Sequence, residues 1–136
     1  NELVILIMLF CLSIKQPNFS ICIAHINRYF SEKIEVLRNF WVKDIILDPG
    51  FGFGKTVEQQ HQMMDELQHI SFGKYPLLVG ISRKSFIYKP LGKNPLDIDE
   101  ETQQLHLKVL EKGAKILRVH DVASAKRTLD KFFKYI

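Results

Sequence analysis

The chain has 136 residues, about the length of one domain, and 46% hydrophobic with 25% charged residues is typical of a soluble globular protein. The net charge of +4 comes from scattered Lys and Arg rather than from a basic run, so we expect no nucleic-acid partner. Cys11 and Cys22 have no companion ligand cluster, so neither a disulfide framework nor a zinc site is expected, and a cytoplasmic setting fits best.

An almost wholly apolar run occupies residues 3–12. It is too short to span a bilayer, and no basic residue precedes it as in a secretory signal, so we expect no membrane association. We predict a strand within residues 3–10, followed by a loop to about residue 25. Because the chain begins with Asn1 rather than Met, we expect a fragment of a longer protein.

The next segment has apolar residues at steps of three or four, which predicts a helix. Its expected buried face consists of Ile26, Phe30, Ile34, Leu37 and Trp41. The apolar triplet at residues 45–47 predicts a buried strand. Thr56 and Gln59 have capping-box spacing, so a second helix should start near Val57 and run to about His69, with its methionines in the core.

The order of strand and helix recurs in the second half of the chain. We predict strands at residues 77–79 and 116–120, a loop from Pro90 to Asp99, and a helix over roughly Glu100 to Lys112. Asp121 is expected to cap a last helix. The expected buried face of that helix consists of Val122, Ala125, Leu129, Phe132 and Ile136. Short strands alternating with helices imply parallel pairing and therefore an α/β fold.

Unusual polar residues lie at the carboxyl ends of three of the predicted strands. Residues 48–56 have the sequence D-P-G-F-G-F-G-K-T, residues 80–85 have G-I-S-R-K-S, and residues 118–122 have R-V-H-D-V. The first is neither a P-loop nor a dinucleotide fingerprint, because Pro49 and Lys55 stand where those motifs require glycine. Parallel strands present their carboxyl ends at one edge, where such folds bind ligands, so we predict a site there.

Each of these groups suits a particular chemistry. Asp48 could accept two parallel hydrogen bonds from the amidine-like edge of a heterocycle, ligate a metal or cap a helix. Arg118 and His120 share one face of a strand and suit a phosphate or carboxylate, although Arg118 could instead pair with Asp121. Lys84, beside an arginine and two serines, suits an anion or a ring carbonyl. The remaining histidines lack metal-ligand spacing, and we expect surface or packing roles for His25, His61, His69 and His106.

In order and spacing, the three strand ends together resemble those of dihydropteroate synthases. The resemblance covers roughly residue 26 to the end and implies that residues 26–136 form the C-terminal half of a pterin-binding domain, made of the last βα units of a TIM-type (β/α)8 barrel. That family condenses 6-hydroxymethyl-7,8-dihydropterin diphosphate with p-aminobenzoate, releasing pyrophosphate and forming dihydropteroate in folate biosynthesis. The resemblance further implies a target of sulfonamides, a homodimer at full length, and Mg²⁺ whose ligand region is absent from this chain, so no metal ligand is expected within it.

The resemblance also implies roles for individual residues. Asp48 would bind the amino-pyrimidine edge of the pterin, and Lys84 its ring oxygen and nitrogen. Arg118 and His120 would bind the diphosphate, with Arg118 also covering the pterin face, and Ser82 would bind the carboxylate of p-aminobenzoate. Lys84, Arg118 and His120 would be the catalytic residues. Further substrate-binding residues would be Gly52, Phe53, Gly80 and Arg83.

Some features depart from the family pattern. Residues 1–25 match it poorly, which suggests out-of-frame or decayed sequence, while Trp41 and Gln60 stand where relatives tend to have a small residue and Asn. Because typical barrels need about 250 residues to close, we expect the chain alone to fold poorly and to show little or no activity. The alternatives are a non-catalytic barrel remnant, another pterin-binding enzyme such as a methyltetrahydrofolate methyltransferase, and a generic phosphate-binding α/β domain.

Overall fold

A computed structural model describes residues 5–8 and 19–134 of the chain. Its strands are β1 (Ile5–Met8), β2 (Ile45–Asp48), β3 (Leu78–Val79) and β4 (Ile116–Leu117). Its α-helices are α1 (Phe19–Asn39), α2 (Val57–Asp65), α3 (Ser85–Leu91), α4 (Asp99–Glu111) and α5 (Val122–Lys134), and a 3-10 segment, η1 (Leu67–Gly73), follows α2. No helix in these ranges is long and apolar enough to cross a membrane.

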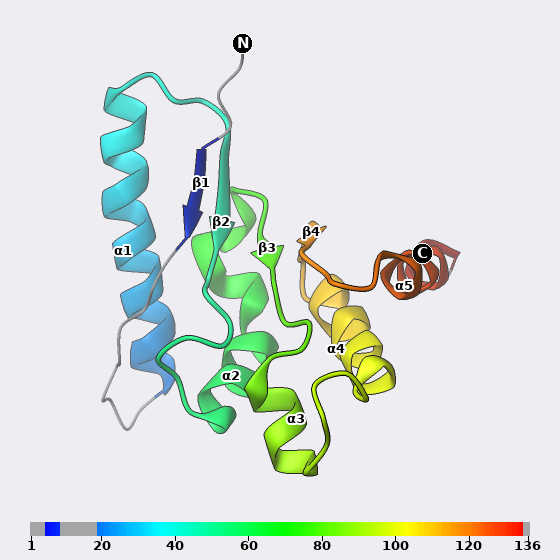
Figure 1. Cartoon of the computed structure of the whole chain (residues 1–136). Coiled ribbons are helices and arrows are strands. Elements are labelled where there is room, and N and C mark those ends of the chain that lie inside the picture. The colour runs from blue at the N-terminus through cyan, green and yellow to red at the C-terminus, as the bar shows by residue number, and fades with distance from the viewer. Residues whose placement is uncertain (1–4, 9–18, 135–136) are drawn as a thin grey trace.

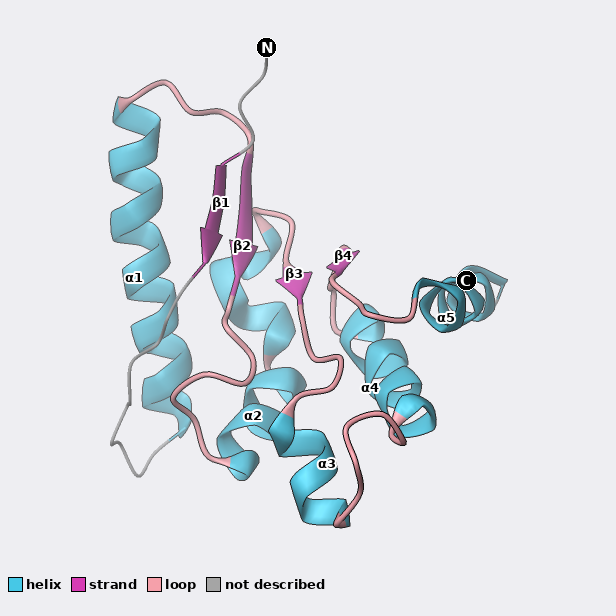
Figure 2. Cartoon of the chain, viewed as in Figure 1, coloured by secondary structure: helices cyan, strands magenta, loops and turns pink. Residues whose placement is uncertain are grey.

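The strands are parallel and follow one another in chain order. β1 pairs with β2 from Ile5 opposite Ile45 onward, and β3 pairs with β4. A parallel bridge between Leu47 and Leu77 joins the two pairs. Because every pairing is parallel, the strands point the same way and their carboxyl ends lie at one edge (Figures 1 and 2). Helices connect successive strands along the chain. This confirms the predicted α/β fold of carboxyl-terminal βα units from a TIM-type barrel.

The core lies between the strands and the helices that pack on them. Ile26, Phe30 and Ile34 form the buried face of α1, as the apolar spacing predicted. Met63 and Met64 of α2 are fully buried, which confirms their predicted packing role. Burial of one such side chain stabilises the fold by about 1.5–3 kcal/mol. Because the core joins α1, α2 and the strands, it fixes where the strand ends lie.

The start of α1 corrects the predicted loop. The helix begins at Phe19, so the expectation of loop as far as residue 25 is wrong for residues 19–25, while residues 9–18 lie outside the described part. The reason is that Ile23 continues the helical step to Ile26 and packs against the core. The division of the chain near residue 25 stays a prediction, although α1 crosses that point without interruption.

The end of α1 corrects the predicted role of Trp41. The Trp41 side chain is 87% exposed rather than buried, and its backbone is left-handed with φ of 63°. Its N–H donates to the carbonyl of Arg38, and the N–H of Val42 donates to that of Leu37. These two bonds form the Schellman motif that closes many helices, and they place residue 41 beyond the buried face.

Three other helical predictions need correction. α2 ends at Asp65 rather than near His69, and η1 follows it with left-handed backbone at Ser71 and Phe72. The sequence pattern did not reveal α3, which is short and carries Pro90 in its last turn, so the predicted loop starts too early. On α5, Val122 is exposed, and the buried positions are Ser124, Ala125 and Thr128. The cause is that α5 packs on α4 partly through polar side chains; Ile136 lies outside the described residues.

Candidate functional site

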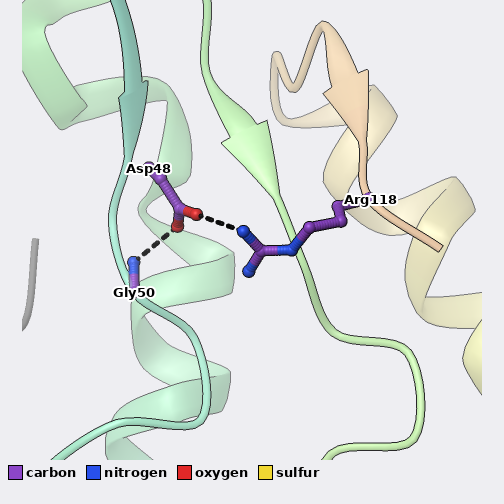
Figure 3. A network of polar contacts seen from close by, with 3 residues as sticks. All are labelled: Asp48, Gly50 and Arg118. Carbon is purple, nitrogen blue, oxygen red and sulfur yellow. Dashed lines mark hydrogen bonds and ion pairs between the residues drawn. The ribbon is translucent and has the colours of Figure 1, made fainter. Parts of the chain in front are cut away.

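The ends of β2 and β4 meet through an ion pair. Asp48 is the last residue of β2 and is only 1% exposed. Its Oδ1 accepts a hydrogen bond of 2.9 Å from the Gly50 N–H, and its Oδ2 lies 3.2 Å from Nη1 of Arg118 (Figure 3). A buried carboxylate is costly unless it is paired and hydrogen-bonded, and here both conditions are met. The two residues predicted to bind a pterin and its diphosphate are therefore neighbours.

Gly80, which follows β3, makes room for the Arg118 side chain. A Cβ atom at position 80 would lie 2.5 Å from Nη2 and 2.9 Å from Nε of Arg118. The guanidinium thus lies against the main chain of the neighbouring strand end on its way to Asp48. The predicted involvement of Gly80 has a steric meaning, because any side chain there would displace Arg118.

Ser82 and His120 form a second contact between strand ends. The Oγ of Ser82 and Nδ1 of His120 lie 3.0 Å apart, within hydrogen-bond distance. Asp121 next to them accepts a 2.9 Å bond from the Ser124 N–H, which confirms its predicted role as the cap of α5. This backbone hydrogen bond holds the pKa of the Asp121 carboxyl below its usual value. Residues after β3 and β4 thus converge, as predicted for the substrate-binding edge.

Lys84 contacts the glycine loop between β2 and α2. Its Nζ lies 4.6 Å from the centre of the Phe53 ring, a cation–π distance. Gly52 has a left-handed φ of 86°, and a Cβ there would lie 2.9 Å from Cδ of Lys84. Both features favour glycine at position 52. The predicted site residues of the loop, Gly52 and Phe53, therefore pack beside Lys84.

Arg83 is exposed and has left-handed backbone with φ of 58°. Together with Ser82 and Asp121 it lines a small cavity of about 60 Å³. Larger cavities of about 380 and 480 Å³ lie elsewhere, one around Tyr75 and Lys112 and one between α1 and η1. The walls of these two cavities contain none of the predicted site residues, which instead converge at the carboxyl ends of the strands.

The charges of the site favour an anionic ligand over a metal ion. Arg118 pairs with the carboxylate of Asp48, whose two oxygens already accept from N–H donors, and two further cations, Arg83 and Lys84, follow the neighbouring strand β3. Within residues 5–8 and 19–134, no group of three or more His, Cys, Asp or Glu could hold a metal. Mg²⁺ demands several oxygen ligands, and Asp48, Lys84, Arg118 and His120 do not supply such a set. The Mg²⁺ that the resemblance implies stays a prediction.

Two residues that hold the glycine loop were missed by sequence reasoning. The Oε1 of Gln60 accepts a 3.0 Å bond from the Gly52 N–H, and Nζ of Lys55 donates to the carbonyls of Gly50 and Phe53. The departure from the family pattern at position 60 was the only signal that pointed to either. A buried glutamine on a helix gives no other indication of its partner.

Comparisons with known proteins agree with this geometry. Residues 4–120 match the family model described as pterin binding enzyme. The bifunctional dihydropteroate synthase/dihydropteroate reductase of Helicobacter pylori is 46% identical over 96 residues, which are 71% of this chain and 25% of that protein. The dihydropteroate synthase of Synechocystis is 40% identical over 103 residues, 74% of this chain and 36% of its own length.

Solved structures give the same result for the fold. A Yersinia pestis dihydropteroate synthase with a pterine-sulfa conjugate is 28% identical and superposes with a TM-score of 0.88 over 98% of this chain and 52% of its own. The chain therefore spans between a quarter and about half of the length of these relatives. The converging strand ends, the family match and the superposition lead to one conclusion: this chain belongs to the pterin binding enzyme family.

Proposed function

We propose that this chain carries the carboxyl-terminal part of a dihydropteroate synthase site. The reaction would join 6-hydroxymethyl-7,8-dihydropterin diphosphate to p-aminobenzoate and release pyrophosphate. The observation that carries the proposal is the 3.2 Å pair of Asp48 and Arg118 at the ends of β2 and β4. A carboxylate that would accept from a heterocycle edge lies next to a cation that would bind a diphosphate. The proposal is supported by the related Yersinia enzyme, whose structure contains a pterine-sulfa conjugate.

The pterin would bind at Asp48. An ionised carboxylate offers about four acceptor positions, and the Gly50 N–H and Arg118 occupy two of them. Two remain for the parallel N–H groups of an amino-pyrimidine. Asp48 is buried beside Arg118, so a pterin can reach its carboxylate only if the guanidinium makes room. We infer that Arg118 moves from the carboxylate toward the diphosphate when the ligand enters. Lys84 lies next to the loop and would reach the ring oxygen and nitrogen.

The chemistry would rely on charge separation. The C–O bond between the pterin methylene and the diphosphate breaks, and its electron pair leaves with pyrophosphate. The amine of p-aminobenzoate forms the new C–N bond and loses one proton to water. Negative charge grows on the leaving group, so donors such as His120 and, once it has moved, Arg118 would stabilise the transition state more than the ground state.

The p-aminobenzoate would bind beside Phe53, with its carboxylate toward Ser82 and Arg83. Sulfonamides share the aminophenyl group and would compete there. The proposal extends to Mg²⁺ accompanying the diphosphate, to a homodimer and to a cytoplasmic location, all of which rest on the family resemblance.

Calorimetric titration with 6-hydroxymethylpterin diphosphate tests the proposal. We expect the wild-type chain to bind and Asp48→Asn to bind on the order of 100-fold more weakly, because one charge-assisted hydrogen bond becomes a neutral one and the other is lost, since the amide Nδ2 donates and does not accept. Asp130→Asn, which alters a carboxylate paired with Lys126 on the surface of α5, should leave the affinity unchanged. A chain that melts cooperatively yet binds no pterin, or equal affinities for wild type and Asp48→Asn, would refute the proposal.

A further inference from the structure

The glycine loop at residues 49–56 lies between β2 and α2 and is held mainly by side chains. One anchor is Gln60 in α2, whose Oε1 accepts a 3.0 Å hydrogen bond from the Gly52 N–H. The Gln60 side chain is only 1% exposed. Buried polar side chains nearly always have a hydrogen-bond partner, and the partner of the Gln60 oxygen is the main chain of the loop.

The contact of Gln60 is not needed to cap its own helix. The capping box of α2 is already closed by Thr56 and Gln59, whose side chains bond to each other's backbone N–H groups. Gln60 instead reaches back across eight residues to Gly52. Its bond therefore fixes the loop rather than the helix end.

Lys55 holds the loop from a second direction. Its Nζ donates to the carbonyl of Gly50 at 3.2 Å and to that of Phe53 at 3.1 Å. Gly50 is also bonded to the carboxylate of Asp48. The loop, whose three glycines all have left-handed backbone, is thus fixed at Gly50, at Gly52 and at Phe53.

The position of the loop determines the surroundings of Lys84. The Phe53 ring lies 4.6 Å from Nζ of Lys84, and Gly52 leaves no space for a Cβ beside Cδ of the same side chain. A shift of the loop by about 1 Å would change both contacts, and misplacement on this scale is enough to reduce the rate of a reaction by about 100-fold.

We propose that Gln60 is a positioning residue for the p-aminobenzoate side of the site. It acts through the Gly52 N–H, which places the Phe53 ring as a wall for an aryl amine that bears a carboxylate, and Lys55 supports the same loop. Gln60 itself does not contact the ligand. The inference rests on the proposed function and assigns to Gln60 the role of fixing the loop beside which p-aminobenzoate would bind.

Gln60→Met tests this role, because methionine has a similar length and fits a buried position but lacks the amide oxygen. We expect p-aminobenzoate to bind about 10-fold more weakly, since one hydrogen bond to the loop is lost, while 6-hydroxymethylpterin diphosphate binds within about 2-fold of wild type. Hydrogen exchange at the Gly52 amide should become faster. Gln60→Glu keeps an acceptor oxygen and should retain slow exchange. The matched control is Gln62→Met, the same change on the exposed side of α2.

The outcomes separate this inference from the proposed function. Unchanged p-aminobenzoate affinity in Gln60→Met would overturn the positioning role, and an equal loss for both ligands would also overturn it by indicating general destabilisation. If the wild-type chain binds neither ligand, the proposed function itself fails, and the positioning role fails with it. Selective loss of p-aminobenzoate, with faster Gly52 exchange, supports both.

Discussion

At the scale of single residues, the site depends on the lack of a side chain at Gly80, which leaves space for the Arg118 guanidinium. Gly80 carries no positive φ, so alanine is compatible with its backbone. The three atoms nearest to the place that a Cβ would take all belong to the Arg118 guanidinium. A methyl group at this position would therefore act on the Asp48–Arg118 pair with little effect on the rest of the fold.

We predict that Gly80→Ala weakens binding of 6-hydroxymethylpterin diphosphate by about 10-fold or more and lowers the free energy of unfolding by less than about 1 kcal/mol, because a flexible side chain yields rather than the backbone. Calorimetry and denaturant unfolding measure the two effects. In a chain that already carries Arg118→Met, Gly80→Ala should have no further effect on affinity. Equal losses in both backgrounds would show that Gly80 acts independently of Arg118.

His106 on α4 is fully buried, and burial lowers the pKa of its imidazole to about 4. Its Nδ1 lies 3.1 Å from the Gln103 side-chain oxygen, while no described residue bonds to its Nε2. Asp99 is the charged group whose field raises this pKa, but the effect of burial is larger. His106 is thus a neutral packing residue, as the sequence led us to expect.

This burial predicts a pH-dependent stability. Above pH 6.5 His106 is neutral in the folded and the unfolded chain; between pH 6.5 and about 4 only the unfolded chain binds the proton. The free energy of unfolding should therefore fall by up to about 3 kcal/mol across this window. Urea unfolding at several pH values measures the fall, and His106→Leu should abolish this part of it. An identical pH dependence in both proteins would contradict the assignment.

At the scale of the elements, two helix caps were predicted from local signals in the sequence, whereas contacts between distant segments were not predicted. The capping box at Thr56 and the cap at Asp121 were predicted and are confirmed, because each uses residues within a few positions of the helix start. The buried face of α5 was predicted only in part: Ala125 is buried, but Val122 is exposed. Ser124 and Thr128 are buried instead and bond to side chains of α4. An apolar pattern contains no information about such polar packing.

The site follows the same rule. The sequence predicted that Asp48, Lys84, Arg118 and His120 share one edge, because each lies at the carboxyl end of a strand in a parallel sheet. The predicted strand at residues 116–120 was too long, since β4 ends at Leu117 and both Arg118 and His120 follow it. It did not predict that Arg118 pairs with Asp48, seventy positions earlier, or that Gln60 holds the glycine loop. Both contacts depend on how strands and helices pack in three dimensions.

The end of α1 offers a test of helix termination. Trp41 occupies the left-handed position of a Schellman motif, where glycine is preferred because a Cβ costs about 1–2 kcal/mol in that conformation. We predict that Trp41→Gly raises the free energy of unfolding by about 1 kcal/mol in denaturant titrations, since the exposed indole contributes little burial. Trp41→Ala, which retains a Cβ, should give no such gain. A glycine variant less stable than the alanine variant would argue against a Schellman end at this position.

At the scale of the whole molecule, the strand ends and the larger cavities lie in different places. The cavity of about 380 Å³ is lined by Gly73, Gly113, Lys74, Lys112 and Lys115 and also presents cations to solvent. An anion could in principle bind at either place. We assign the pterin diphosphate to the edge formed by Asp48, Gly80 and Arg118, because only there does a buried carboxylate lie beside a guanidinium.

Amide NMR spectra recorded during titration with 6-hydroxymethylpterin diphosphate test this assignment most directly, because glycines lie at both places. We predict that the Gly50, Gly52 and Gly80 signals shift together and saturate at one ligand concentration, while those of Gly73 and Gly113 stay unchanged. Shifts confined to Gly73 and Gly113, or no shifts in a folded chain, would contradict a pterin site at the ends of the strands.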